Sequence, residues 1–496
     1  MKRVYKNLLS SILPQLVNII SNLILPGLII AKFGSEINGL VSTTKTIVSY
    51  IALVGAGIAT AVTQSLYAPV AKGDTERIKG MLHAANDMFV KYGIVYCVIT
   101  VLVAVIYPFC VSSGIDFLTI ALLLVVMSLS GASEFFVTGR CRTLLYASQK
   151  VYICNIIQAV SLLVGLIVAV VMLKLNAGIV WVQLAISLVY VVRAAVLLLY
   201  VNRCYPELRD FPKTPAIAQT VSKRNDAMIH QLSGLAVTGS QSLILSVLVS
   251  FEAASIYAVY NIVFSGLQSI CANINTAVTP YLGKEISLEH EEKARNIYDV
   301  IELGFVLLVA FVYSVATLMI VPFVRLYTAG ADINYLYTDF AVLFAFSSMF
   351  YILKMPGTAA INAAGHFRQT RIRALAEAAI CVVIGLAVTP LVGQNGVLIG
   401  TLVALGWRCF DTVLYANKYI LKTGNAKTMC RVLFCVLMVS VSALLAFRWD
   451  IVTASYIQWV LAACIAAAVA LAIIAIYIVF AERKVLNTVM SRIKKV

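Results

Sequence analysis

Residues 454–480 read ASYIQWVLAACIAAAVALAIIAIYIVF and contain no charged side chain. A helix of about 20 apolar residues is long enough to cross the hydrocarbon core of a bilayer, so this stretch predicts a transmembrane helix. Comparable stretches recur along all 496 residues, and the chain is 61% hydrophobic but only 12% charged. That composition excludes a soluble globular protein. Because the apolar residues run continuously instead of alternating, helices are expected and a β-barrel is not.

Fourteen such segments are predicted, which makes the expected fold class an all-α, polytopic membrane protein. The first half holds 8–31, 38–66, 90–111, 117–138, 151–173 and 177–200. The second half holds 226–249, 253–281, 297–324, 333–358, 372–391 and 395–418, and the chain closes with 431–447 and 454–480. The first segment is expected to remain as a helix, because it is too long for a signal peptide and no small-x-small cleavage site follows it.

The distribution of Lys and Arg predicts the orientation of these segments. With the N-terminus inside, the inner segments hold 29 of the 38 basic residues and the outer turns hold four. Cytoplasmic loops carry this excess in membrane proteins. We therefore expect a multi-pass protein of the cell (cytoplasmic) membrane with both termini in the cytoplasm.

Several other classes of function are disfavoured. The net charge of +16 is spread over many short loops, which argues against a nucleic-acid surface. The eleven cysteines form no C-x-x-C pair and lie mostly in apolar segments, so neither disulfides nor a metal site are expected. No Walker loop, metal spacing or catalytic motif occurs. The sequence thus predicts no enzyme, no catalytic residues and no cofactor.

An internal repeat organises the chain. A shift of 216 residues without a gap lays Thr60-Ala61-Val62-Thr63 on Thr276-Ala277-Val278-Thr279, and it also pairs Glu36 with Glu252 and Glu76 with Glu292. Six predicted helices per copy give the copies parallel topology. The expected domains are an N-terminal six-helix lobe (1–200), a cytoplasmic linker (201–225), a C-terminal six-helix lobe (226–420), and two extra helices with a basic tail (421–496).

The start of the chain resembles a known family. The residues that carry this resemblance are Lys6-Asn7, Gln15, Pro26, Phe33-Gly34, Asn38-Gly39 and Gly55-x-Gly57-x-Ala59. They resemble the Wzx-type polysaccharide flippases of the MATE-like superfamily, and the repeat of six helices is similar to that group. The resemblance implies a V-shaped pair of lobes that rocks around a central cavity. It also implies an undecaprenyl-pyrophosphate-linked glycan as cargo, with membrane lipids and other polysaccharide-assembly proteins as partners.

Two predicted helices carry polar stripes. In the first helix Ser11, Gln15, Asn18 and Asn22 share one face, because they are spaced by four, three and four residues. The eighth helix carries a similar set, namely Asn261, Ser265, Gln268 and Asn275. A polar stripe that faced lipid would be costly. The stripes therefore either form hydrogen bonds between helices or line a water-filled cavity.

Five basic residues fall within the spans, namely Lys45, Lys91, Arg193, Lys354 and Arg408. Each costs about 2.5–3.5 kcal/mol at a helix centre. Lys91 and Lys354 lie near the inner face, which predicts snorkelling anchors. The deeper three are candidates for binding an anionic cargo, although Asp411 is placed to neutralise Arg408. For Lys45 the resemblance implies a cation that faces the cavity, while the repeat places Asn261 at the matching position.

The predicted function is a flippase for a lipid-linked anionic oligosaccharide. Its candidate substrate-binding residues are Lys45, Arg193, Arg408, Gln15, Asn18, Asn22, Asn261 and Gln268, and its candidate coupling-ion ligands are Glu134 and Asp411. Glu134 is alternatively a partner for Lys91. A multidrug or cation exporter of the same superfamily is the first alternative, but it would need acids rather than bases at depth. A membrane-embedded glycosyltransferase or polymerase is disfavoured by the short outer turns.

Overall fold

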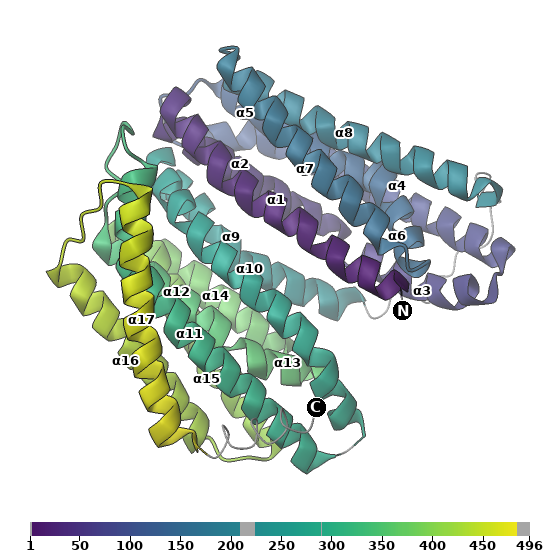
Figure 1. Ribbon diagram of the computed structural model, residues 1–496. Coiled ribbons are helices and arrows are strands. Elements are labelled where there is room, and N and C mark those ends of the chain that lie inside the picture. The colour runs from purple at the N-terminus through teal and green to yellow at the C-terminus, as the bar shows by residue number, and fades with distance from the viewer. Residues whose placement is uncertain (1, 209–223, 289, 484–496) are drawn as a thin grey trace. The chain divides into compact units, whose positions relative to one another are not determined.

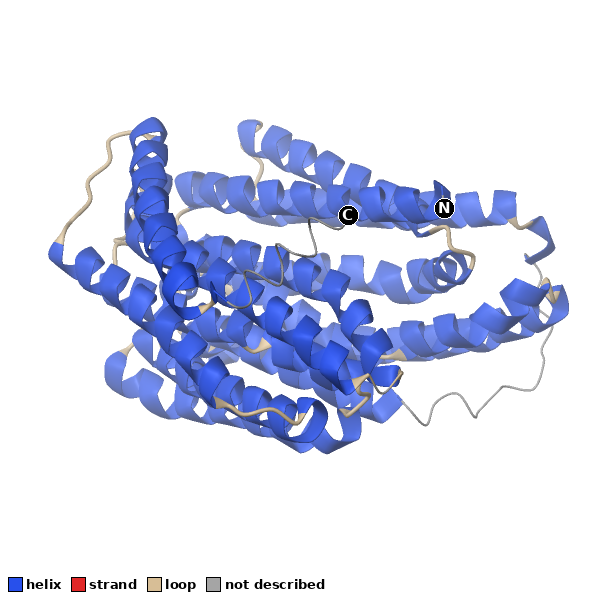
Figure 2. Cartoon of the chain, turned by 60° about the horizontal axis from the view of Figure 1, so that its bottom comes forward, coloured by secondary structure: helices blue, strands red, loops and turns tan. Residues whose placement is uncertain are grey.

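The computed structural model describes residues 2–208, 224–288 and 290–483, and all regular structure in these ranges is helical (Figures 1 and 2). The chain divides into two compact units between Ser255 and Ile256. The first unit contains α1 (Lys2–Phe33), α2 (Ser35–Ala52), η1 (Leu53–Gly55), α3 (Ile58–Lys72), α4 (Thr75–Cys110), α5 (Phe117–Ser133), η2 (Glu134–Thr138), α6 (Gly139–Ala147), α7 (Val151–Lys174), α8 (Ile179–Cys204), η3 (Pro206–Leu208), α9 (Arg224–Leu248) and the start of α10 (Phe251–Ser287).

The second unit begins within α10. It continues with α11 (Glu291–Tyr327), α12 (Thr338–Leu353), α13 (Met355–Ala363), α14 (Phe367–Val392), α15 (Asn395–Tyr415), η5 (Ala416–Leu421), α16 (Ala426–Arg448) and α17 (Tyr456–Ala481). Most of the predicted linker 201–225 and the tail from residue 484 lie outside the described residues, and the predicted lobe boundaries stay a prediction.

The fold class predicted from the sequence is confirmed. Fourteen helical segments of the described chain are long and apolar enough to cross a membrane, and each corresponds to one predicted segment. Several extend past the predicted ends, since α4 and α11 run to 36 and 37 residues. At about 1.5 Å per residue these two helices exceed the bilayer core of about 30 Å, so one end of each projects beyond it.

The helix starts follow the repeat that was found in the sequence. Four helices of the first half and four of the second begin 216 residues apart. The pairs of first residues are Ser35 and Phe251, Thr75 and Glu291, Val151 and Phe367, and Ile179 and Asn395. The common spacing indicates that the two halves use one pattern of helix ends.

The second predicted segment differs from its repeat. Residues 38–66 were expected as one helix, but the chain breaks between α2 and α3, whereas α10 is continuous. Gly57 has φ 80° at this break, a left-handed conformation that glycine adopts without strain. The matching position in α10 is Asn273, which continues the helix. The Gly55-x-Gly57 pattern therefore ends α2, and α3 starts anew.

Side chains fix the helix packing within the first unit. α1 lies beside α7 (Figure 1), where Asn7 accepts from the backbone N–H of Tyr152 and Ser10 accepts from Asn155. Gly39 lets α2 approach α10 closely, because a Cβ at this position would lie 1.7 Å from the Phe251 carbonyl oxygen.

Turns between helices are capped locally. At the start of α5 the Asp116 carboxylate accepts hydrogen bonds from the backbone N–H and the hydroxyl of Thr119, at 2.9 and 2.8 Å. These bonds lower the pKa of Asp116 because they favour its charged form. An N-cap of this kind satisfies N–H groups that the first helical turn leaves unpaired.

In the second unit α11 is the central helix, packed against α12, α16 and α17. α17 has few other neighbours, and only 11% of its apolar 18-residue stretch is buried. Most of its surface is therefore left for lipid. One hydrogen bond at its start runs from the Trp459 indole N–H to the Met319 carbonyl oxygen at 2.9 Å.

Candidate functional site

The predicted polar stripe of α1 meets the cation of α2. The Lys45 ammonium donates to the Asn22 side-chain oxygen at 3.1 Å, and Gln15 and Asn18 are exposed on α1. At 1.5 Å per residue, α2 from Ser35 to Lys45 measures about 15 Å, half the thickness of the bilayer core. Lys45 is exposed at this depth, and no carboxylate of the described residues pairs with it. The structure therefore brings Lys45 and the polar stripe together.

A second group of charges lies where α5 passes into η2. Glu134 is the first residue of this π-helical turn, and its carboxylate pairs with Arg142 of α6 at 2.8 Å and with Arg193 of α8 at 3.5 Å. Arg193 also lies over the Tyr190 ring. The proposed Glu134–Lys91 pair is wrong, because both oxygens of Glu134 face arginines while Lys91 is exposed on α4.

Glycines make room for the π-helical turn. A Cβ at Gly55 would lie 2.2 Å from the Phe135 ring, so the break after α2 receives this side chain of η2. Phe135 also contacts Tyr96, with ring centroids 5.2 Å apart. These contacts anchor Phe135, the neighbour of Glu134 in the chain, and π-helical turns of this kind occur frequently at functional sites.

A larger ion cluster lies in the second unit at the junction between α12 and α13. Lys354 stands at this junction and pairs with Glu377 of α14. Arg408 of α15 contacts Glu377 at 3.2 Å and Asp411 at 2.5 Å, and Asp411 also pairs with Arg373. Arg408 and Glu377 are only 8% and 9% exposed. Three cations thus share two largely buried carboxylates, with Arg373 at the more exposed edge.

This cluster corrects the interpretation of Lys354. The sequence predicted a snorkelling anchor, but the side chain is 15% exposed and points to Glu377. α12 ends at Leu353 and packs against α15, which packs against α14, so the Lys354 ammonium group reaches the Glu377 carboxylate of α14. A snorkelling side chain keeps its charged group in water, whereas the Lys354 ammonium group is stabilised by the carboxylate of an ion pair.

The stripe on α10 is partly a bridge between helices. Gln268 donates to the Ser348 hydroxyl of α12 at 2.7 Å, and this hydroxyl also pairs with Tyr313 of α11 at 2.6 Å. Asn261 is half-buried on the same helix. For Gln268 the structure therefore favours the hydrogen-bonding role that the sequence left open beside cavity lining.

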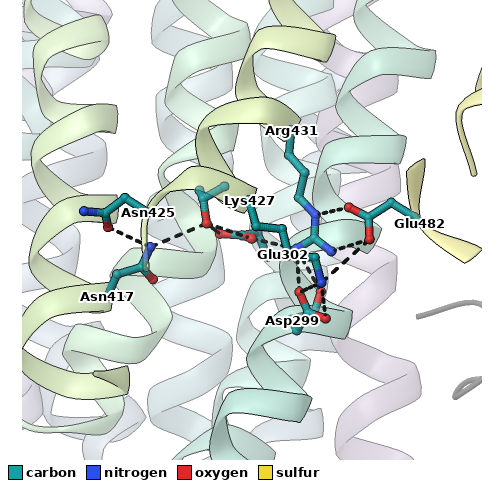
Figure 3. Close-up of polar contacts among 8 residues, drawn as sticks. Asp299, Glu302, Asn417, Asn425, Lys427, Arg431 and Glu482 are labelled. Atoms are coloured by element: carbon teal, nitrogen blue, oxygen red, sulfur yellow. Dashed lines mark hydrogen bonds and ion pairs between the residues drawn. The ribbon is translucent and has the colours of Figure 1, made fainter. Parts of the chain in front are cut away.

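A third ion cluster joins α16 and α17 to α11 (Figure 3). Arg431 of α16 is fully buried and forms a two-pronged contact with Glu482, the residue that follows α17, at 2.7 and 2.9 Å. Its Nη1 atom contacts Glu302 of α11 at 2.7 Å and Asp299 at 2.8 Å. Lys427 pairs with Asp299 at the edge. The cluster fastens the last two helices and presents no open cation.

Several charged residues of these clusters were missed, among them Glu377 and Arg142. Glu377 falls inside the predicted span 372–391, where an acidic residue is as costly as a basic one and was a usable signal. Arg142 looked like one of the basic residues of an inner loop, and no local pattern links it to Glu134 across the π-helical turn. No three His, Cys, Asp or Glu side chains come together as a metal site in the described ranges.

The balance of charge differs between the sites. Glu134 has two arginine partners and Asp411 has two as well, so the negative charge of both candidate coupling-ion ligands is already met. Each of the two clusters at η2 and at Lys354 carries one cation in excess. Lys45 differs from both, because its ammonium group donates to the neutral amide of Asn22 and pairs with no carboxylate in the described part of the chain.

The arrangement of the helices matches known transporters. No model of a known protein family matches the sequence, and no curated protein matches it. An inward-facing multidrug resistance MATE family transporter of the MOP superfamily is similar in structure, with a TM-score of 0.65 and 12% identity over 82% of this chain and 94% of the other. The lipid II flippase MurJ, in an inward closed conformation, has a TM-score of 0.68 and 11% identity over 95% of this chain and 98% of its own.

This chain has the fold of a MOP-superfamily transporter. A MOP-superfamily transporter from Pyrococcus furiosus, for which a binding pocket of reverse polarity suggests a different function, has a TM-score of 0.56 and 13% identity over 85% of this chain and 97% of its own. Identities this low extend the likeness to the fold and no further. With fourteen candidate spans and membrane transporters as its structural neighbours, this chain is a multi-pass membrane protein.

Proposed function

We propose that the protein is a flippase that moves an undecaprenyl-pyrophosphate-linked oligosaccharide from the inner to the outer leaflet of the cell membrane by alternating access, for cell-surface polysaccharide synthesis. The observation that carries this proposal is Lys45, an exposed cation at mid-membrane depth whose partner is the amide of Asn22. A pyrophosphate that leaves water needs such a charge, and charge-assisted hydrogen bonds to phosphate are about twice as strong as neutral ones.

The remaining site residues take secondary roles in this proposal. Gln15 and Asn18 extend the exposed polar face along α1, and they suit the hydroxyl groups of a glycan. Asn261 and Gln268 lie on the matching helix of the second repeat. Arg193 and Arg408 are held by carboxylates, so they supply positive potential to the cargo and are not its direct ligands.

A multidrug exporter is the second candidate, because several similar structures are MATE transporters. Export of cationic drugs would be favoured by a free carboxylate deep in the spans. Among the described residues, however, Glu134, Glu377 and Asp411 are all paired with Arg or Lys. An anionic cargo therefore agrees better than a cationic drug with the charges in the spans. In this proposal the protein transports its cargo and catalyses no reaction.

The membrane potential supplies the work in this mechanism, since the sequence contains no nucleotide-binding motif. One elementary charge that crosses 100 mV gains about 2.3 kcal/mol. A pyrophosphate with roughly two negative charges that leaves an inside-negative cell would gain about 4–5 kcal/mol. Both termini lie in the cytoplasm in this orientation. A potential imposed on vesicles at equal pH and sodium should accelerate flipping. Dependence on an ion gradient alone would instead assign Glu134 or Asp411 to coupling.

Transport by the purified protein in proteoliposomes tests the function. The vesicles should carry a fluorescent undecaprenyl-pyrophosphate-linked oligosaccharide, and a membrane-impermeant quencher reports which leaflet holds it. Protein-dependent flipping is expected for this lipid. Neither the same lipid with a neutral head nor a cationic dye should be transported. Transport of the dye without flipping of the pyrophosphate lipid would overturn the proposal in favour of drug export.

A further inference from the structure

The first unit contains an open cleft between α3 and α6. Its volume is about 450 Å³, and its polar lining comes from Thr60, Thr63, Gln64 and Tyr67 of α3 and from Arg142 and Tyr146 of α6. Clefts of about 300–1,000 Å³ are the usual size of small-molecule sites. The size and the lining make it a candidate site for a polar ligand.

The depth of the cleft matches the surface of the bilayer. The candidate span of the second segment ends at Gly55, and α3 follows it. Along α5, η2 and α6, the path from Phe117 to Arg142 measures about 37 Å, which is longer than the hydrocarbon core of about 30 Å. The predicted orientation puts this end of the helices at the cytoplasmic face. Lipid headgroups lie at this level.

The groups in the cleft are available for a ligand. Gln64, Tyr67 and Tyr146 are exposed, and none of these three side chains hydrogen-bonds to another described residue. Arg142 contacts Glu134 through Nη1 at 2.8 Å, and Glu134 is shared with Arg193. A positive charge is therefore left over. A planar guanidinium favours two-pronged contacts with phosphate, while tyrosine rings offer flat faces to the C–H groups of a sugar.

We propose that this cleft binds a phosphorylated sugar, with Arg142 on the phosphate and with Gln64, Tyr67 and Tyr146 on the sugar. This inference rests on the proposed function, in which the cleft receives the head of the lipid-linked glycan at the inner leaflet before Lys45 meets it. A soluble sugar phosphate offers the same chemistry from the other side of the interface. The experiment separates these two sources.

Equilibrium binding to the full-length protein in lipid nanodiscs tests the cleft without requiring transport. The probes are an undecaprenyl-pyrophosphate-linked sugar, undecaprenyl pyrophosphate without sugar, and a soluble sugar 1-phosphate. The variant Gln64→Ala/Tyr67→Ala should weaken binding of the lipid-linked sugar about tenfold, the effect of one or two lost hydrogen bonds. Arg142→Lys keeps a positive charge beside Glu134 but loses the planar guanidinium, so it should weaken the binding of both pyrophosphate lipids.

Tyr281→Ala is the matched control, because Tyr281 is also an exposed tyrosine and lies outside the cleft on α10. It should bind like the wild type. Binding of the lipid-linked sugar that depends on Gln64 and Tyr67, in a protein that does not flip this lipid, would contradict the flippase proposal alone, so failure of the flippase proposal and failure of this one are distinguishable. Equal affinity of wild type and Gln64→Ala/Tyr67→Ala for every probe would overturn the site. Stronger binding of the soluble sugar phosphate than of the lipid would overturn the cargo assignment.

Discussion

The buried Arg431 should be essential for the attachment of α16 and α17. Its side chain is 0% exposed, and the carboxylates of Glu302 and Glu482 that it contacts are 7% and 4% exposed. Among the described residues, no other guanidinium contacts these two carboxylates. Arg431→Ala leaves these carboxylates buried with Lys427 as the nearest cation, 3.8 Å from Glu482. Removal of one partner from a buried ion pair costs about 3–5 kcal/mol. We expect a loss of this size in the free energy of unfolding.

Reversible unfolding in mixed micelles measures this loss. Lys427→Ala is the control, because its side chain is 50% exposed and surface pairs contribute at most about 1 kcal/mol. Arg431→Met combined with Glu302→Gln and Glu482→Gln should recover most of the stability, since the stranded charges are then removed. If Arg431→Ala unfolds within about 0.5 kcal/mol of the wild type, the cluster does not hold the helices as argued.

Three further predictions follow from single positions. Gly57→Ala should lose about 1–2 kcal/mol in the same unfolding assay because of its left-handed φ, whereas Gly266→Ala in open space on α10 should lose nothing; equal stabilities would contradict the strain at Gly57. Glu377→Ala strands Lys354 and leaves Arg408 with Asp411 alone, so it should cost about 3–5 kcal/mol, against less than about 1 kcal/mol for Glu76→Ala at a surface pair; similar losses would refute the buried cluster. A reporter fused after Val496 should be active only in the cytoplasm, and periplasmic activity would overturn the proposed orientation.

The number, type and approximate ends of the helices could be predicted from the sequence, because hydropathy over about 20 residues is a local property. The repeat could be found for a similar reason, since Glu36 and Glu252 stand in the first turns of helices that begin 216 residues apart. Breaks within a span were harder to predict. Gly57 and Lys354 interrupt apolar segments without lowering their hydropathy enough to be noticed.

Partners of charged residues were the least predictable part of the site. Glu134 pairs with Arg142 across an irregular turn and with Arg193 on another helix, so tertiary packing and not spacing decides the contacts. The depth of Lys45 and the shared face of the polar stripe on α1 did follow from helical periodicity, because each depends on one helix at a time, but the contact between Lys45 and Asn22 did not. The cleft between α3 and α6 requires the packed structure and leaves no pattern in the sequence.

The initial rate of flipping by Lys45 variants tests the central claim most directly. Lys45→Gln keeps a polar side chain beside Asn22 but removes the charge, and the loss of a charged hydrogen bond worth about 1.5–3 kcal/mol should slow flipping of the pyrophosphate-linked glycan about 10- to 100-fold. Lys45→Arg should retain most of the rate. Lys91→Gln, at an exposed lysine of α4 near the predicted inner boundary, should match the wild type. Flipping by Lys45→Gln at the wild-type rate would contradict the proposed role of this cation.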